Sequence, residues 1–245
     1  VAISGSSPST PPMMPGVDPT GAAVANPAGT NAVDARAPAM SMPTPLAGMP
    51  LGLLEEYTRQ HLAASSDEVI RFSWHGGEPT ILGLDYFRRV VDIQRRLCPP
   101  GRKIANGLQT NGTLLDEEWG NFLSAEGFAV GLSLDGPRKI HDSYRVRRDG
   151  RPSFAEAMRG CETLRRHGVP VDILCVVGAH NAGRPAEVYG FFKEIGASHL
   201  TFLPLVERRP GAPGGVSPET VSAEAWGDFL CAVFDEWLAR DIGRI

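Results

Sequence analysis

The chain has 245 residues, of which 42% are hydrophobic and 21% are charged, and its formal net charge is -4. These values are typical of a soluble globular protein with a sizeable core, and they give no general electrostatic reason to bind nucleic acid. No apolar run reaches the ~18 residues of a membrane helix, and the N-terminus lacks the basic and apolar regions of a signal peptide. We therefore expect a cytoplasmic protein without membrane or nucleic-acid partners.

Residues 1–50 differ in composition from everything that follows. They contain ten prolines, ten alanines and five of the six methionines, but only three charged residues. This mixture has the period of neither a helix nor a strand, so we predict an irregular, low-complexity segment. The predicted folded domain is therefore residues 51–245.

From residue 51 onward, helices and strands alternate. Helices are predicted at 51–64, 84–97, 116–127, 154–168, 185–196 and 222–241, and strands at 69–74, 103–110, 128–134, 169–177 and 199–205. Asp116 and Ser153 are the expected N-caps of their helices. The last helix is expected to face inward with Trp226, Leu230, Val233, Phe234 and Trp237.

Alternating strands and helices predict an α/β fold with a parallel sheet and right-handed crossovers. Since the chain has no dinucleotide-type G-x-G-x-x-G motif, the pattern favours a barrel-like arrangement, while a doubly wound sheet stays an alternative. In both folds, ligands bind at the carboxyl ends of the strands.

Polar residues and glycines follow three successive strands. The first strand ends in HGGEPT (75–80), the second in QTNGT (109–113) and the third in SLDGP (133–137). Each loop alone is ordinary turn chemistry. Because the three loops occupy equivalent strand ends, we predict that they share one ligand site.

The residue types in these loops suit a ligand with an amino-acid head and a ribose. Gly76, Gly77 and Glu78 offer backbone carbonyls and a carboxylate to an ammonium group. Ser133 can bond a ribose hydroxyl, and the planar fork of Arg145 can clamp a carboxylate.

His75 and Asp135 are the only acid–base pair at the predicted mouth. They are therefore the weak catalytic candidates for a further alternative, an unrelated metabolic (β/α) enzyme.

Four segments, FSWHGGEPTILGLDYF, LQTNGTLLDEEW, GLSLDGPRKIHDSYRV and LTFLPLVER, together resemble the anaerobic sulfatase-maturating enzymes, from about residue 52 to the end. This family belongs to the radical S-adenosylmethionine (SAM) proteins. The resemblance implies a partial (β/α)6 barrel with SAM and a [4Fe-4S] cluster at its mouth. It also implies an electron donor and a sulfatase or other peptide substrate, whose Cys or Ser a 5′-deoxyadenosyl radical converts to Cα-formylglycine.

The resemblance also implies residue roles. Gly76, Gly77 and Glu78 would meet the SAM amino group, Ser133 the ribose and Arg145 the carboxylate. The same mouth would be lined by Gln109, Asn111 and Asp135. His75 stands where family members often have glutamine, which makes its transfer to a substrate role weaker.

The cysteines depart from the family pattern. The family holds its cluster with C-x3-C-x2-C ahead of the GGEP strand, but no cysteine here precedes Cys98. In the segment NPAGTNAVD, Thr30 stands where a thiolate is needed, as does Ala35 just beyond it, and neither can replace a soft ligand on iron. We therefore predict no metal ligands, and we expect Cys161 and Cys175 to be core residues.

Two accounts fit this departure. In the first account, the chain is a fragment: its residues 1–50 are not the ancestral sequence, and it lacks the family's C-terminal auxiliary-cluster domain. In the second account, it is a degenerate relative that keeps the barrel and the SAM pocket but not the redox centre. The abrupt change at residue 50 beside intact loops favours the first account. We expect a radical SAM maturase core that is inactive as written; the alternative is a non-catalytic barrel remnant that binds SAM or a peptide.

Overall fold

The computed structural model describes residues 48–211 and 213–245, which belong to one compact unit, Thr44–Ile245. The predicted irregular segment lies outside the described residues except for its last three positions. Thr30 and Ala35 lie outside them as well.

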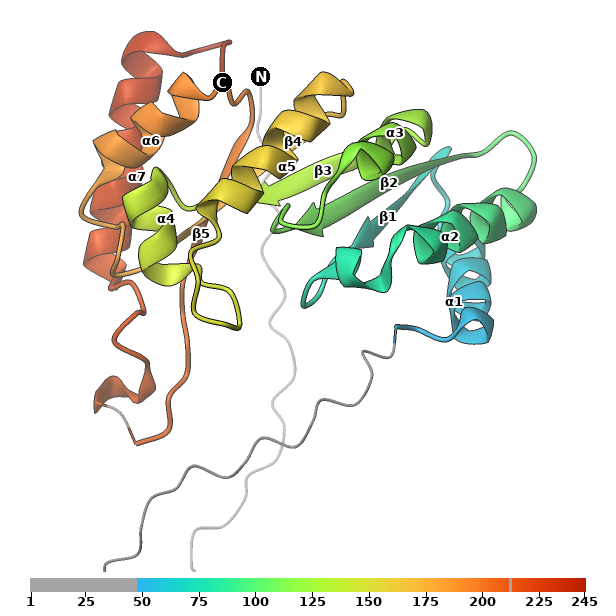
Figure 1. Ribbon diagram of the computed structural model, residues 1–245, viewed down its shortest axis with the longest axis horizontal. Coiled ribbons are helices and arrows are strands. Elements are labelled where there is room, and N and C mark those ends of the chain that lie inside the picture. The colour runs from blue at the N-terminus through green and yellow to red at the C-terminus, as the bar shows by residue number, and fades with distance from the viewer. Residues whose placement is uncertain (1–47, 212) are drawn as a thin grey trace, which may run out of the picture. The chain divides into compact units, whose positions relative to one another are not determined.

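Five parallel strands form one sheet in the order β1-β2-β3-β4-β5 (Figure 1). Their bounds are β1 Val69–Trp74, β2 Lys103–Thr110, β3 Ala129–Ser133, β4 Val171–Val177 and β5 Leu200–Pro204. Each strand pairs with the next one along the chain, and right-handed crossovers that all step the same way place their helices on one face. This arrangement confirms the predicted α/β fold of a partial barrel.

Helices connect and flank the strands. They are α1 Leu51–Ala64, α2 Leu84–Leu97, α3 Glu117–Ala125, α4 Arg138–Tyr144, α5 Phe154–Arg166, α6 Pro185–Glu194 and α7 Ala223–Arg240, with short 3-10 helices η1 Pro79–Leu82 and η2 Pro213–Gly215. All six predicted helices are present, and α4 is an additional one. No helix in the described part of the chain is both long enough and apolar enough to cross a membrane.

The two predicted N-caps have different outcomes. Asp116 caps α3 by accepting a hydrogen bond from the backbone N–H of Trp119 at 3.0 Å, as expected. Ser153 does not cap α5 with its side chain. Instead, Oδ1 of Asp142 in α4 accepts from the N–H groups of Ser153 and Phe154 at 3.1 and 2.9 Å. Ser153 therefore occupies the predicted N-cap position, but a carboxylate from the neighbouring helix supplies the capping hydrogen bonds.

The inward face of α7 also differs from the prediction. Phe229 and Val233 are buried, whereas Leu230 and Phe234 are 38% and 54% exposed. The buried stripe follows the spacing of three and four residues, so the helix turns Leu230 and Phe234 toward solvent. Trp226 and Trp237 are partly buried against the core, as expected.

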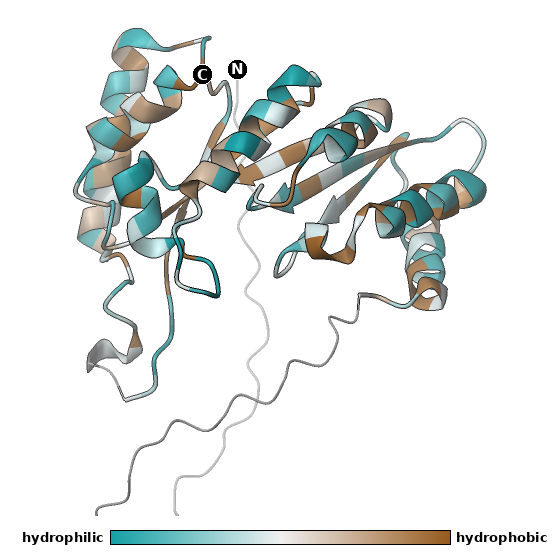
Figure 2. Cartoon of the chain, in the orientation of Figure 1, coloured by the Kyte–Doolittle hydropathy of each residue, from teal (hydrophilic) through white to brown (hydrophobic). Residues whose placement is uncertain are grey.

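The core lies between the sheet and its helices. Cys161 of α5 and Cys175 of β4 are buried in it, as predicted, and the helices show the alternation of hydrophobic and hydrophilic residues that this packing requires (Figure 2). On its first three strands, the opposite face of the sheet has small and polar residues. Through the strand register, Ser73 lies beside Gly107, and Gln109 lies beside Gly131.

Candidate functional site

Glu78 ties the ends of the first two strands together. Its Oε1 accepts hydrogen bonds from the backbone N–H and hydroxyl of Thr80 at 3.1 and 2.6 Å and from the hydroxyl of Thr110 at 2.6 Å. Its Oε2 accepts from the backbone N–H of Asn111 at 2.8 Å. The carboxylate is thus largely used within the protein, and one acceptor position on Oε2 is left.

Gly76 and Gly77 present bare backbone beside this carboxylate. Both have positive φ, 104° and 25°, a conformation that favours glycine, and both are exposed. No atom outside the neighbouring residues lies within 4 Å of the point where a Cβ would stand. A ligand can therefore approach the peptide groups of this turn closely.

Gln109 and Ser133 meet on the sheet face that the helices leave free. The amide Nε2 of Gln109 donates to Oγ of Ser133 at 3.1 Å. The Gln109 side chain lies directly over Gly131, where any Cβ would overlap its Oε1. Because Ser133 accepts from Gln109, its own hydroxyl hydrogen can be donated elsewhere.

Asp135 and Arg145 form a buried ion pair at the end of β3. Asp135 is fully buried, and its Oδ2 and Oδ1 accept from Nε and Nη2 of Arg145 at 2.5 and 3.0 Å. Oδ1 also accepts from the backbone N–H of Val176 at 2.9 Å. Two of the five guanidinium N–H groups are used in this way, so the terminal Nη edge of Arg145 is left for a ligand.

His141 and Ser153 adjoin Arg145, and neither was predicted as a site residue. His141 Nε2 lies 3.1 Å from Oγ of Ser153, whose hydroxyl donates to the carbonyl oxygen of Arg145 at 2.8 Å. Burial lowers the pKa of His141 to about 4. Residues 138–144 carry no helix signal in the sequence, so the position of His141 one turn before Arg145 could not be predicted.

His180 follows β4 and is a second unpredicted residue. Its ring stacks on that of Tyr144, with centroids 4.7 Å apart, and its Nε2 lies 4.0 Å from Oδ2 of Asp135. Neither ring nitrogen has a hydrogen-bond partner, and burial lowers the pKa of His180. Extending the strand-end rule to the fourth strand would have found this residue.

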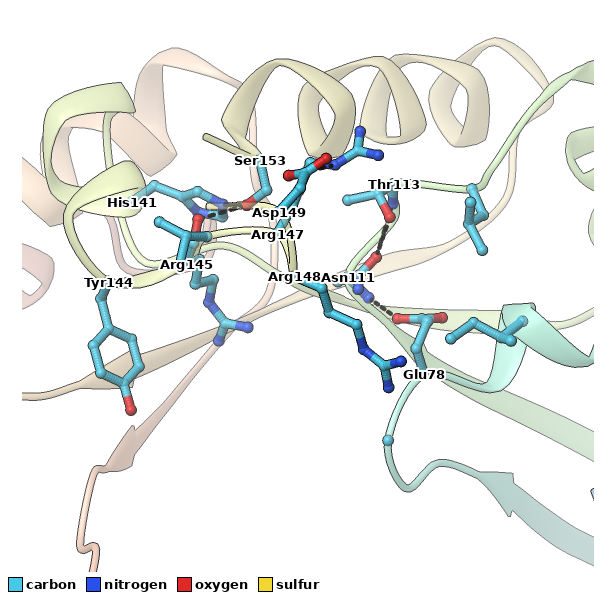
Figure 3. A pocket seen from close by; sticks show the side chains of 14 residues that line it. Glu78, Asn111, Thr113, His141, Tyr144, Arg145, Arg147, Arg148, Asp149 and Ser153 are labelled. Carbon is cyan, nitrogen blue, oxygen red and sulfur yellow. Dashed lines mark hydrogen bonds and ion pairs between the residues drawn. The ribbon is translucent and has the colours of Figure 1, made fainter. Parts of the chain in front are cut away.

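Two cavities are lined by some of the predicted site residues. A cavity of about 680 Å³ is lined by Gly77, Glu78, Asn111 and Arg145 among others, and Figure 3 shows the His141–Ser153 pair and the Glu78–Asn111 pair on its two sides. A smaller cavity of about 290 Å³ is lined by His75, Gly76 and Glu78. The walls of these two cavities do not include Gln109, Ser133 or Asp135.

The residues that face the mouth fit the amino-acid end of SAM better than they fit an iron–sulfur cluster. The exposed glycine backbone and the free edge of Arg145 match an ammonium group and a carboxylate. Within residues 48–211 and 213–245, no group of three His, Cys, Asp or Glu side chains could hold a metal ion. The four cysteines, two of them buried in the core, therefore do not fit a [4Fe-4S] cluster.

Comparison with known proteins places this site in context. The model of the Radical SAM superfamily matches residues 44–192. A serine-type anaerobic sulfatase-maturating enzyme of Bacteroides thetaiotaomicron is 38% identical over 205 residues, covering 78% of this chain and 49% of that protein. A cysteine-type enzyme of Clostridium perfringens is 38% identical over 170 residues, covering 68% and 45%.

A solved structure shows the same likeness. Native anSMEcpe with bound AdoMet and Cp18Cys peptide superposes with a TM-score of 0.72 at 34% identity, covering 80% of this chain and 54% of that one. The chain spans about half the length of the curated relatives it matches. The family match, the parallel half-barrel and the strand-end loops agree, and the chain belongs to the radical SAM superfamily, whose cofactors are SAM and a [4Fe-4S] cluster.

Proposed function

We propose that this chain is the SAM-binding core of a protein-modifying radical SAM enzyme of the sulfatase-maturating type. The observation that carries the proposal is the joint placement of bare glycine backbone and a half-free Arg145 guanidinium around one large cavity. The likeness to anSMEcpe with bound AdoMet and a peptide supports the same reading. Its substrate would be a peptide of a sulfatase or similar protein, and it would need an electron donor.

The proposal gives each strand end a task. The peptide groups of Gly76 and Gly77 receive the SAM amino group, and the terminal edge of Arg145 receives the carboxylate. Glu78 holds this turn against β2, and its remaining acceptor position faces the same amino group. Ser133 donates to the ribose from the position that Gln109 gives it, and Asn111 lines the mouth.

The cluster limits what the chain does with SAM. When bound, the family's [4Fe-4S] cluster supplies the electron that cleaves SAM. Neither the cysteines nor any other described group of residues fits that cluster. We therefore propose that the chain as written binds SAM and does not cleave it, and that oxidation of Cys or Ser to Cα-formylglycine belongs to the complete enzymes of the family.

This misfit also favours the second candidate function, a non-catalytic barrel that holds SAM or a peptide. An unrelated metabolic enzyme is not favoured. Asp135 is fully buried with both oxygens bonded, and His75 lines the smaller cavity instead of joining it.

Calorimetric titration with SAM tests the proposal. Replacing Arg145 with lysine keeps a positive charge beside Asp135 but removes the planar fork, so we expect SAM binding to weaken about 10-fold or more. Arg151→Ala is the matched control, because Arg151 is an exposed arginine of the same loop that bonds Asp149. The absence of binding heat in the unmodified chain, or equal losses in both variants, would contradict the proposal.

A further inference from the structure

The geometry points to His141 and Ser153 as positioning residues that hold Arg145 in the orientation in which its free guanidinium edge faces the cavity. This inference rests on the proposed function, in which Arg145 receives the SAM carboxylate. It assigns a task to two side chains that line the same cavity and are linked by hydrogen bonds to the backbone of Arg145 instead of its guanidinium.

The hydrogen bonds of His141 have a defined direction. The backbone N–H of Asp135 donates to Nδ1 of His141 at 3.4 Å, so Nδ1 is an acceptor and the neutral ring carries its hydrogen on Nε2. Nε2–H then donates to Oγ of Ser153, and the Ser153 hydroxyl donates to the carbonyl oxygen of Arg145. The three hydrogen bonds connect the backbone N–H of Asp135, just after β3, to the backbone carbonyl of Arg145.

The environment keeps His141 in this neutral form. The ring is 1% exposed, and burial is the largest cause that lowers its pKa to about 4. Arg145 and His180 lower this pKa further, while Asp135 and Asp142 act in the opposite direction. At neutral pH the imidazole therefore has one donor and one acceptor, as the chain of bonds requires.

Arg145 needs such support because it lies just beyond the end of its helix. It follows α4 with non-helical backbone angles, φ -87° and ψ 93°, and the chain then continues into an exposed loop closed by the bridge between Val146 and Pro152. Asp135 fixes the guanidinium, and the Ser153 hydroxyl fixes the carbonyl. An arginine whose guanidinium and backbone carbonyl are both fixed loses less conformational entropy when it binds a ligand.

A purely structural role for these bonds makes a different prediction. The contact between α4 and α5 is also held by Asp142, which caps α5 through the backbone N–H groups of Ser153 and Phe154 and so needs neither positioning side chain. If Ser153 only joined the helices, its removal would lower the melting temperature and weaken every ligand alike. If it positions Arg145, its removal weakens ligands that carry a carboxylate.

The test compares SAM with decarboxylated SAM by calorimetry on the full 245-residue chain. Ser153→Ala is expected to weaken SAM about fivefold and to leave decarboxylated SAM unchanged, while Ser153→Thr, which keeps the hydroxyl, restores SAM binding. His141→Gln, which keeps an N–H donor toward Ser153, should bind SAM more tightly than His141→Leu. Ser124→Ala is the control. Ser124 lies on α3, and its hydroxyl donates to the backbone carbonyl of His167 at 2.8 Å.

The outcomes distinguish failure of the positioning role from failure of SAM binding itself. Equal weakening of both ligands by Ser153→Ala, or no weakening of either, overturns the positioning role while leaving SAM binding intact. If Ser153→Ala does not fold, the comparison of His141→Gln with His141→Leu decides, and equal affinities there overturn the role. A wild-type chain that binds neither ligand refutes the proposed function itself, and the positioning role with it.

Discussion

Replacing Asp135 with alanine is expected to lower the free energy of unfolding by about 3–5 kcal/mol, the range found when one partner of a buried ion pair is removed. Asp135 is fully buried, and it bonds both Nε and Nη2 of Arg145. The alanine variant leaves the guanidinium, whose side chain is 23% exposed, without its counter-charge, and leaves the Val176 N–H without its acceptor. Urea denaturation measures the loss.

Asp172→Ala is the matched control for this variant. Asp172 is a carboxylate on the neighbouring strand β4, but it is largely exposed and its contact with His199 is 3.8 Å long. Such a surface pair contributes about 0–1 kcal/mol. A loss below about 1 kcal/mol for Asp135→Ala would show that the Asp135–Arg145 pair does not hold this end of the sheet.

Replacing Gly160 with alanine is expected to destabilise the protein by about 2–3 kcal/mol, as overpacking of a buried site does. Replacing a glycine inside a helix with alanine usually stabilises a protein by about 1 kcal/mol. For Gly160 we expect the opposite sign of the stability change. The reason is a close backbone contact: a Cβ on Gly160 in α5 would overlap the carbonyl oxygen of Gly112, in the loop that follows β2. Thermal and urea unfolding both report the change.

Gly190→Ala provides the control within the same class of position. Gly190 lies inside α6, and no atom beyond its neighbours lies within 4 Å of the point where its Cβ would stand. We expect this variant to be stabilised by about 0.5–1 kcal/mol. Similar stability changes in the two variants would contradict the close contact between α5 and the loop at Gly112.

The sequence predicted the helices and strands well where the hydrophobic pattern extends over enough residues to be recognised. All five strands and six helices were expected, because apolar runs mark the strands and a repeat of three and four residues marks the longer helices. The seven-residue helix α4 was missed, since two turns after a D-G-P turn carry little periodic signal. The N-cap position of α5 was predicted correctly, but the side chain that caps it was not, because Asp142 lies eleven positions before Ser153 and meets it only in the folded chain.

The sequence predicted which residues lie at the site much better than it predicted the contacts between them. The strand-end rule located the turn at Gly77, Glu78 and Asn111, which line one cavity with Arg145. It could not show that the Arg145 fork is shared with Asp135, because such a pairing depends on tertiary geometry. The fit of Gln109 over Gly131 depends on the register between β2 and β3, which composition and periodicity do not fix.

We propose that this chain keeps a site for the amino-acid end of SAM, while its four cysteines do not fit the cluster that shares SAM in the family. Anaerobic reconstitution of the full chain with iron and sulfide, followed by electron paramagnetic resonance with and without SAM, tests it most directly. We predict no SAM-responsive [4Fe-4S] signal, although SAM still binds by calorimetry. A stable cluster signal that changes when SAM is added would contradict the claim.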